Sequence, residues 1–171
     1  MMLAMDKYLP RIFREPIVAA KIKGATVLDY GAGNNKAAEK YVRRKGGTYL
    51  AYEPYRMSFW DNCISLMKFE RAQGPKIVIC SNVLNDITDD EELSDVIKIL
   101  NDYAREGATV AISIYEGDIR YGNKMRVSLG KEIPEYVKKR DMKFAEYLPL
   151  LQADNPIKVQ NRFYLMGKGW E

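Results

Sequence analysis

The stretch TVLDYGAGNN, residues 26–35, decides the fold class. Strand-forming residues lead to the acid Asp29, and glycines follow at positions 31 and 33. Glycine lets the backbone turn sharply and approach a ligand without a Cβ in the way. In a parallel α/β sheet, ligands bind where the first strand turns into its helix. The sequence therefore predicts a ligand-binding turn over residues 29–35, and a tight turn without a ligand is the alternative.

Strand-forming segments alternate with helical patterns around this turn. The expected strands are residues 25–31, 48–54, 76–84, 108–117 and a last one near 159–168, and the expected helices are residues 36–45, 56–71, 88–107 and 132–140. Strands that are apolar nearly throughout are typical of a parallel sheet covered on both faces. We therefore expect an α/β fold, a doubly wound Rossmann-like sandwich with a mostly parallel sheet and an antiparallel C-terminal strand.

Two helices carry signals that a structure can test directly. In the second, an apolar stripe predicts a buried face, formed by Met57, Trp60, Ile64 and Met67. In the third, Thr88 is the expected N-cap, with Glu91 three residues later completing a capping box.

Composition limits the possible chemistry. The chain has 171 residues, 47% of them hydrophobic, which is enough for one well-packed domain. It has no histidine, which excludes histidine triads and histidine metal sites. Cys63 and Cys80 form no C-x-x-C pair, so we expect two structural thiols rather than a disulfide or a zinc site. No apolar run is long enough to span a membrane, so a cytoplasmic protein is expected.

The charge around the glycine turn indicates the kind of ligand. A dinucleotide fingerprint needs a third glycine at the position of Lys36. A carboxylate at Asp29 would oppose a pyrophosphate and favour a cation, and S-adenosylmethionine is such a ligand. Glu53 ends the second strand 20 residues after Gly33, where a carboxylate can accept hydrogen bonds from both ribose hydroxyls.

These motifs resemble the class I S-adenosylmethionine-dependent methyltransferases. VLDYGAGNN is similar to their first motif, AYEP to the acidic end of their second strand, KIVICSNVLNDITDDEEL to their fourth strand and following helix, and REGATVAISIYEG to their fifth strand. The resemblance covers roughly residues 20–117. It implies methyl transfer with S-adenosylhomocysteine as product, no metal, and a cofactor site formed by Asp29, Tyr30, Gly31, Ala32, Gly33, Glu53, Pro54, Ser81 and Asn82.

One departure from the family pattern concerns the third strand. Only about 20 residues separate Glu53 from the next strand, and one helix fills them. The third strand is therefore expected to be reduced or missing, together with the acid that usually contacts adenine. Within a single domain, residues 1–24 are expected to form a helical segment, residues 25–117 the cofactor-binding core, and residues 118–171 a basic substrate-side segment with the last strand.

Candidate catalytic residues lie at and just after the end of the strand expected over residues 76–84. Methyl transfer needs an aligned nucleophile and often no strong base. Asn82 and Asn85 could hold an amine or hydroxyl, and Asp86 could accept a proton. The alternative interpretation is that Asn85 and Asp86 only cap a turn.

The methyl acceptor is indicated only by charge. Residues 81–84 read SNVL, without the aromatic motif of enzymes that methylate DNA base amines. Residues 118–143 hold eight bases and four acids, a net charge of +4. We therefore expect Arg120, Lys124 and Arg126 to face a nucleic acid or another anionic substrate. Tyr115, at the end of the strand expected over residues 108–117, is a further substrate-binding candidate on position alone. A solvated basic loop, a small-molecule acceptor, and a homodimer or non-catalytic partner subunit are the alternatives.

Overall fold

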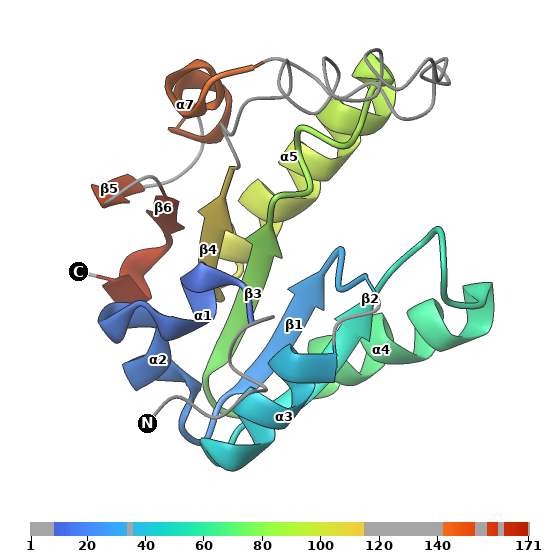
Figure 1. Ribbon diagram of the computed structural model, residues 1–171, viewed down its shortest axis with the longest axis vertical. Helices are drawn as coiled ribbons and strands as arrows, with labels where there is room; N and C mark the ends of the chain where they lie inside the picture. The colour runs from blue at the N-terminus through green and yellow to red at the C-terminus, as the bar shows by residue number, and fades with distance from the viewer. Residues whose placement is uncertain (1–8, 34–35, 115–141, 153–156, 161–162, 171) are drawn as a thin grey trace, which may run out of the picture.

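The computed structural model describes residues 9–33, 36–114, 142–152, 157–160 and 163–170. Their centre is a six-stranded sheet with the order β2-β1-β3-β4-β6-β5 (Figure 1). The strands are β1 (Thr26–Tyr30), β2 (Thr48–Tyr52), β3 (Lys76–Ser81), β4 (Thr109–Ser113), β5 (Ile157–Gln160) and β6 (Phe163–Met166). β1 to β4 are parallel, and β6 is antiparallel to β4 and β5. The expected α/β fold with a mostly parallel sheet is confirmed.

Helices cover both faces of this sheet. The first face is covered by α1 (Arg11–Arg14), α2 (Pro16–Ile22), α3 (Lys36–Arg44) and the short 3-10 helix η3 (Lys168–Trp170). The second face is covered by α4 (Phe59–Arg71), α5 (Asp90–Arg105) and α7 (Phe144–Gln152). The sheet is thus the middle of three layers.

The order of the strands places a switch point beside β1. The connection from β1 through α3 leads outward to β2, whereas the connection from β2 through α4 leads back across β1 to β3. Because such crossovers are right-handed, the reversal puts α3 and α4 on opposite faces. Ligands of doubly wound sheets bind at the carboxyl ends of the strands beside such a point.

The third strand of the family pattern is missing from the described residues, as the sequence predicts. One helix, α4, connects β2 directly to β3. Among the described strands, β2 pairs with β1 alone, so β2 is an edge of the sheet.

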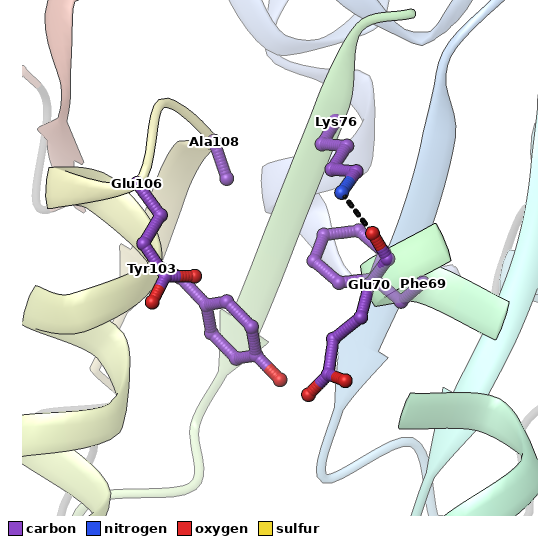
Figure 2. A pocket seen from close by; sticks show the side chains of 6 residues that line it. All are labelled: Phe69, Glu70, Lys76, Tyr103, Glu106 and Ala108. Atoms are coloured by element: carbon purple, nitrogen blue, oxygen red, sulfur yellow. Dashed lines mark hydrogen bonds between the residues drawn. The ribbon is translucent and has the colours of Figure 1, made fainter. Parts of the chain in front are cut away.

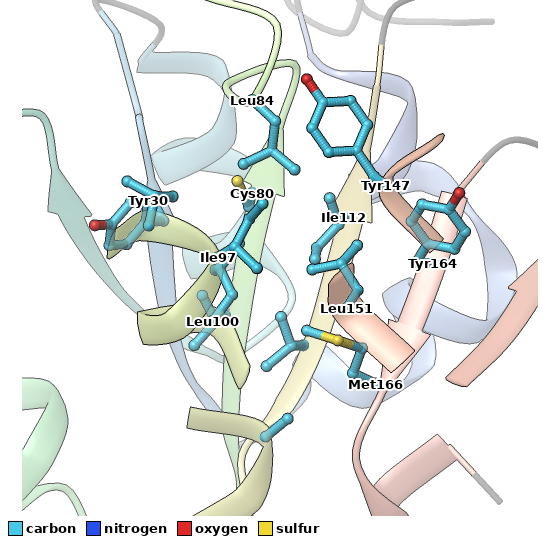
Figure 3. Packing of buried hydrophobic residues seen from close by; sticks show 14 of the residues in the cluster. Tyr30, Cys80, Leu84, Ile97, Leu100, Ile112, Tyr147, Leu151, Tyr164 and Met166 are labelled. Atoms are coloured by element: carbon cyan, nitrogen blue, oxygen red, sulfur yellow. The ribbon is translucent and has the colours of Figure 1, made fainter. Parts of the chain in front are cut away.

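Aromatic and aliphatic side chains fill the second face of the sheet. Near the amino end of β3, the rings of Phe69 and Tyr103 meet edge to face at 5.4 Å and join α4 to α5 (Figure 2). Towards the other edge, Tyr147 and Leu151 of α7 pack against strand residues such as Ile112 (Figure 3). These contacts fix α5 and α7 over the second face of the sheet.

The apolar stripe of α4 is a correction to the sequence prediction. The helix begins at Phe59 rather than near residue 56, and its buried residues are Asn62 and Phe69. Trp60, Ile64 and Met67 point away from the sheet, with 73%, 42% and 41% of their surfaces exposed. The periodicity was that of a helix, but packing on β2 and β1 buries the opposite side.

Two smaller predictions also differ. The N-cap of α5 is Asp89, whose carboxylate accepts from the Glu92 backbone N–H at 2.8 Å, rather than Thr88. The expected last strand is two short antiparallel strands, β5 and β6, followed by η3. The helix expected over residues 132–140 lies outside the described residues.

Both cysteines lie in the part of the chain that the structure describes. Both thiols are free, and Cys80 is fully buried, which raises its pKa above the ordinary thiol value. Across the described ranges, no group of three or more acids and cysteines could hold a metal ion. No helix in the same ranges is long and apolar enough to cross a membrane.

Candidate functional site

The turn after β1 needs glycine for two reasons. Gly31 and Gly33 have φ values of +82° and +59°, in the left-handed region. A Cβ on Gly31 would also lie 2.3 Å from Cγ2 of Val83. The N–H groups of Gly31 and Ala32 donate to the Tyr52 carbonyl at 2.8 and 3.1 Å, which ties the turn to the end of β2.

Glu53 joins this turn to the segment after β2. Its Oε2 accepts from the Gly33 N–H at 2.8 Å, and its Oε1 accepts from the Tyr55 N–H at 3.2 Å. The residue is only 7% exposed, yet it lines a cavity. A carboxylate has about four lone-pair sites, so these two bonds leave acceptor capacity for a ligand.

Asn62 holds Glu53 from the buried side of α4. Its Oδ1 accepts from the Glu53 N–H at 2.7 Å, and its Nδ2 donates to the Glu53 carbonyl at 3.1 Å. The same Nδ2 donates to the Ser58 carbonyl at 3.2 Å. This residue was not predicted from the sequence. The available signal was a polar side chain opposite the apolar stripe of an amphipathic helix.

Asp29 has a different environment from the one expected. It is buried, and the Tyr49 hydroxyl donates to its Oδ2 at 2.7 Å. Burial raises the pKa of Asp29 to about 7, the Tyr49 hydrogen bond opposes this, and the charge of Glu53 adds to it. With this pKa, Asp29 is only partly ionised at neutral pH, so the negative charge that it presents is smaller than the sequence alone predicts. Of the two carboxylates beside the turn, Glu53 is the one that faces the cavity.

The cavity at this edge of the sheet has a volume of about 890 Å³, near the upper end of the roughly 300–1,000 Å³ of small-molecule sites. Its walls come from the ends of β1 and β2, the segment after β2, the segment after β3 and the first ten residues of α5. The lining residues are Tyr30, Gly31, Gly33, Tyr52, Glu53, Pro54, Tyr55, Arg56, Val83, Asp86, Ile87, Thr88, Glu92, Asp95, Val96 and Ile99.

The charged part of this lining is mainly acidic. Carboxylates come from Glu53, Asp86, Glu92 and Asp95, against the guanidinium of Arg56. The hydroxyl of Tyr55 donates to the Glu92 carboxylate and so joins the segment after β2 to α5. This bond is the main cause that raises the pKa of Tyr55 to about 12. Negative potential in a low-dielectric cleft attracts cations.

The face of α5 in the cavity is a part of the site that sequence reasoning missed. Glu92, Asp95, Val96 and Ile99 follow the i, i+3, i+4, i+7 spacing of one helical face. Acids and aliphatic side chains that share one helical face in the sequence could have indicated that this face lines a ligand site.

Six of the predicted site residues come together around the cavity. They are Tyr30, Gly31, Gly33, Glu53, Pro54 and Asp86. Asp29 and Ala32 do not line the cavity. The Asp29 carboxylate accepts from the Tyr49 hydroxyl, and the Ala32 N–H donates to the Tyr52 carbonyl, so both residues bond to β2.

Ser81, Asn82 and Asn85 lie outside this lining. The Ser81 hydroxyl is 3.0 Å from that of Ser113, and the Asn82 N–H donates to the Ser113 carbonyl at 2.8 Å. Asn82 has a φ of +62°, a left-handed conformation that asparagine tolerates better than most residues.

Asn85 has a structural environment. It is buried, accepts from the Tyr147 hydroxyl at 2.7 Å and donates to the Met142 carbonyl at 3.1 Å. These bonds attach the chain around α7 to the segment after β3. The structure does not bring Asn85 to the cavity, and the alternative of a turn-stabilising role fits it better. Tyr115, Arg120, Lys124 and Arg126 lie outside the described residues.

A second cavity does not suit a cofactor. It measures about 100 Å³ and lies between α4 and α5 at the amino end of β3 (Figure 2). Lys76 closes it by donating to the Glu70 carbonyl at 2.7 Å. It is small and lies at the wrong end of the strands for a doubly wound sheet.

Comparison with known proteins gives the fold. No protein family model and no curated protein sequence matches the chain. Among solved structures it is similar to the PH0226 protein from Pyrococcus horikoshii OT3, with a TM-score of 0.57 and 12% identity over 91% of this chain and 87% of that one. Another similar structure, assigned by its name to the Zn-dependent alcohol dehydrogenases of Rhodobacter sphaeroides, has a TM-score of 0.48, 16% identity, and coverage of 95% and 87%. The first likeness shows a Rossmann-like fold.

Proposed function

We propose that this chain is an S-adenosylmethionine-dependent methyltransferase. The observation that carries the proposal is the position of Glu53. Its carboxylate is anchored by the Gly33 N–H, has acceptor capacity left, and lines a large cavity at the switch point of the sheet. This is where a carboxylate can accept from the two hydroxyls of an adenosine ribose.

Charge supports this cofactor over a dinucleotide. The described lining of the cavity contains four carboxylates and one guanidinium, which would repel a pyrophosphate and attract a sulfonium and an ammonium. The antiparallel strand β6 also departs from the six parallel strands of the dinucleotide-binding order. Both observations agree with the family that the sequence resembles.

The chain's own residues would act as follows. Gly31 and Gly33 keep the wall free of side chains, and Glu53 orients the ribose. When bound, S-adenosylmethionine would supply an electrophilic methyl group on its sulfonium for transfer to the acceptor's lone pair, with a neutral thioether as the leaving group. Asp86 lines the cavity and would accept the acceptor's proton. Asn82 is a further candidate for holding the acceptor.

The described walls favour a neutral or cationic small molecule as acceptor. Asp86, Glu92 and Asp95 line the cavity together with Glu53, and these carboxylates would repel a polyanion. The anionic-substrate hypothesis rests on Arg120, Lys124 and Arg126. Anisotropy titration of a labelled oligonucleotide at low salt separates the two acceptor classes.

The proposal is tested by ligand binding. Calorimetry should show S-adenosylmethionine and S-adenosylhomocysteine binding and no binding of NAD. Glu53→Gln should weaken both by about 1.5–3 kcal/mol, or roughly tenfold to a hundredfold, because bonds to a charged acceptor are lost. Glu39→Gln is the matched control, since Glu39 pairs with Arg43 on the outside of α3. Tighter binding of NAD, or equal affinity in Glu53→Gln, would contradict the assignment.

A further inference from the structure

Helix α4 carries a large apolar surface on its outer side. Trp60, Ile64 and Met67 follow one another at helical spacing, 73%, 42% and 41% exposed. Phe59, also 73% exposed, packs its ring edge to face against Trp60 at 5.5 Å. Contiguous exposed apolar surface of this kind is uncommon on monomers and marks binding sites.

This surface lies at an unpaired border of the sheet. α4 packs on β2 and β1, and β2 pairs only with β1 among the described strands (Figure 1). Open strand edges are usually covered or paired in native proteins. The helix face and the strand edge therefore lie at the same border, where a further element is expected.

We infer that this outer face of α4 binds a second copy of the chain, with the two α4 helices antiparallel about a two-fold axis near Ile64. The residue spacing supports the self-pairing. Such an axis sets Trp60 of each copy against Met67 of the other, and Ile64 against its own equivalent. A two-fold interface needs a patch that is complementary to itself, and this stripe is.

The charges on the helix specify the antiparallel arrangement. Asp61 and Lys68 are both exposed and, seven residues apart, lie on the same flank of α4. In the antiparallel pair, Asp61 of each copy faces Lys68 of the other, so the symmetry forms the contact twice. A parallel pair would place this flank of the two copies on opposite sides of the interface, so Asp61 and Lys68 could not make this contact.

The available area is sufficient for a weak to moderate dimer. At 73% exposure, Phe59 and Trp60 together offer roughly a third of the ~800 Å² that each partner buries in a standard interface. Ile64, Met67 and the edge of β2 extend the same surface. Aromatic residues at the centre of an interface commonly supply most of its affinity.

Sedimentation of the full chain between about 1 μM and about 1 mM, where weak dimers dissociate, tests the inference. The wild type should form dimers in this range, and Ile64→Lys should raise the dimer Kd at least tenfold. Leu150→Lys, at an equally exposed site on α7, should leave the Kd unchanged. A wild type that stays monomeric, or a dimer that tolerates Ile64→Lys, would overturn the inference. Circular dichroism checks that each variant is folded.

Cross-linking tests the symmetry independently. In antiparallel helices about 8–10 Å apart, inward Cα atoms at the axis are roughly 3.5–5.5 Å apart, which overlaps the range that a disulfide spans. Ile64→Cys in a Cys63→Ser background should therefore form a linked dimer under mild oxidation. Arg71→Cys in the same background should not, because its two copies lie about 20 Å apart. Efficient linking through position 71 and none through position 64 would overturn the antiparallel arrangement.

Discussion

Replacing Asp29 with Asn should change how the stability of the protein depends on pH. The carboxyl is buried, and its pKa is raised to about 7 from an ordinary value of 3.8. Between these two values the unfolded chain has released its proton while the folded chain retains it. Raising the pH through this range therefore favours unfolding. The stability is fully present below the lower pKa and is lost as pH rises through the upper one.

The size of the effect follows from the two pKa values. A pKa that is higher by one in the folded chain than in the unfolded chain corresponds to about 1.4 kcal/mol, so the complete effect is roughly 4 kcal/mol. Between about pH 5 and about pH 8, the wild type should lose roughly 2–3 kcal/mol of unfolding free energy relative to Asp29→Asn. The amide has nearly the same shape and keeps an oxygen for the Tyr49 hydroxyl, so the comparison isolates the titration.

Urea unfolding followed by tryptophan fluorescence, at a series of pH values for both proteins, measures the difference. Tyr49→Phe provides a second check. It removes the hydrogen bond that lowers the pKa of Asp29, so the loss of stability should extend to higher pH. A stability difference between wild type and Asp29→Asn that stays constant across the series would refute the reasoning.

Two further predictions concern the turn and its support. Gly31→Ala should destabilise the protein by about 1–2 kcal/mol because of its positive φ, and it should weaken S-adenosylhomocysteine binding because the new Cβ displaces Val83 into the cavity. Gly33→Ala has open space around the new Cβ, so it should show only the loss of stability that its positive φ causes. Urea unfolding measures the stability and calorimetry the binding. Asn62→Ala should reduce the affinity for adenosine but not for 2′,3′-dideoxyadenosine. Ser58→Ala, which removes only the N-cap of α4, should reduce neither, and equal losses for both nucleosides would argue against a role of Asn62 in positioning Glu53.

The sequence predicted those parts of the molecule whose pattern is local. The four parallel strands are short apolar runs that end in turn residues, and β1 with its glycines requires one type of turn. The missing third strand could also be inferred, because the distance from Glu53 to β3 leaves room for only one helix. The apolar stripe on α4 has the period of a helix, as predicted. Which side of the helix is buried depends on the neighbouring elements, and the apolar side is exposed because α4 packs on β2 and β1 with its other side.

The remaining errors arise from contacts between distant segments. Asp29 is hydrogen-bonded by Tyr49, which lies diagonally across from it on β2, and its pKa is raised by burial among segments that no local pattern brings together. Asn85 resembled a catalytic amide by position, but its partners Tyr147 and Met142 come from about 60 residues further along the chain. The acidic wall on α5 requires the helix to be placed over the cavity before Glu92 and Asp95 become site residues.

The missing third strand connects the proposed site with the proposed interface. Without that strand and its helix, α4 is the one element between β2 and β3. The buried side and the outer side of α4 make different contacts. Its buried side holds the backbone of Glu53 through Asn62, and its outer side presents Trp60 and Ile64. A contact on the outer side would restrain the first turns of α4, which are also the turns that fix the carboxylate. A loss of dimerisation would therefore affect cofactor binding through the order of this helix, whereas the glycine turn would remain attached to β2 by its own hydrogen bonds.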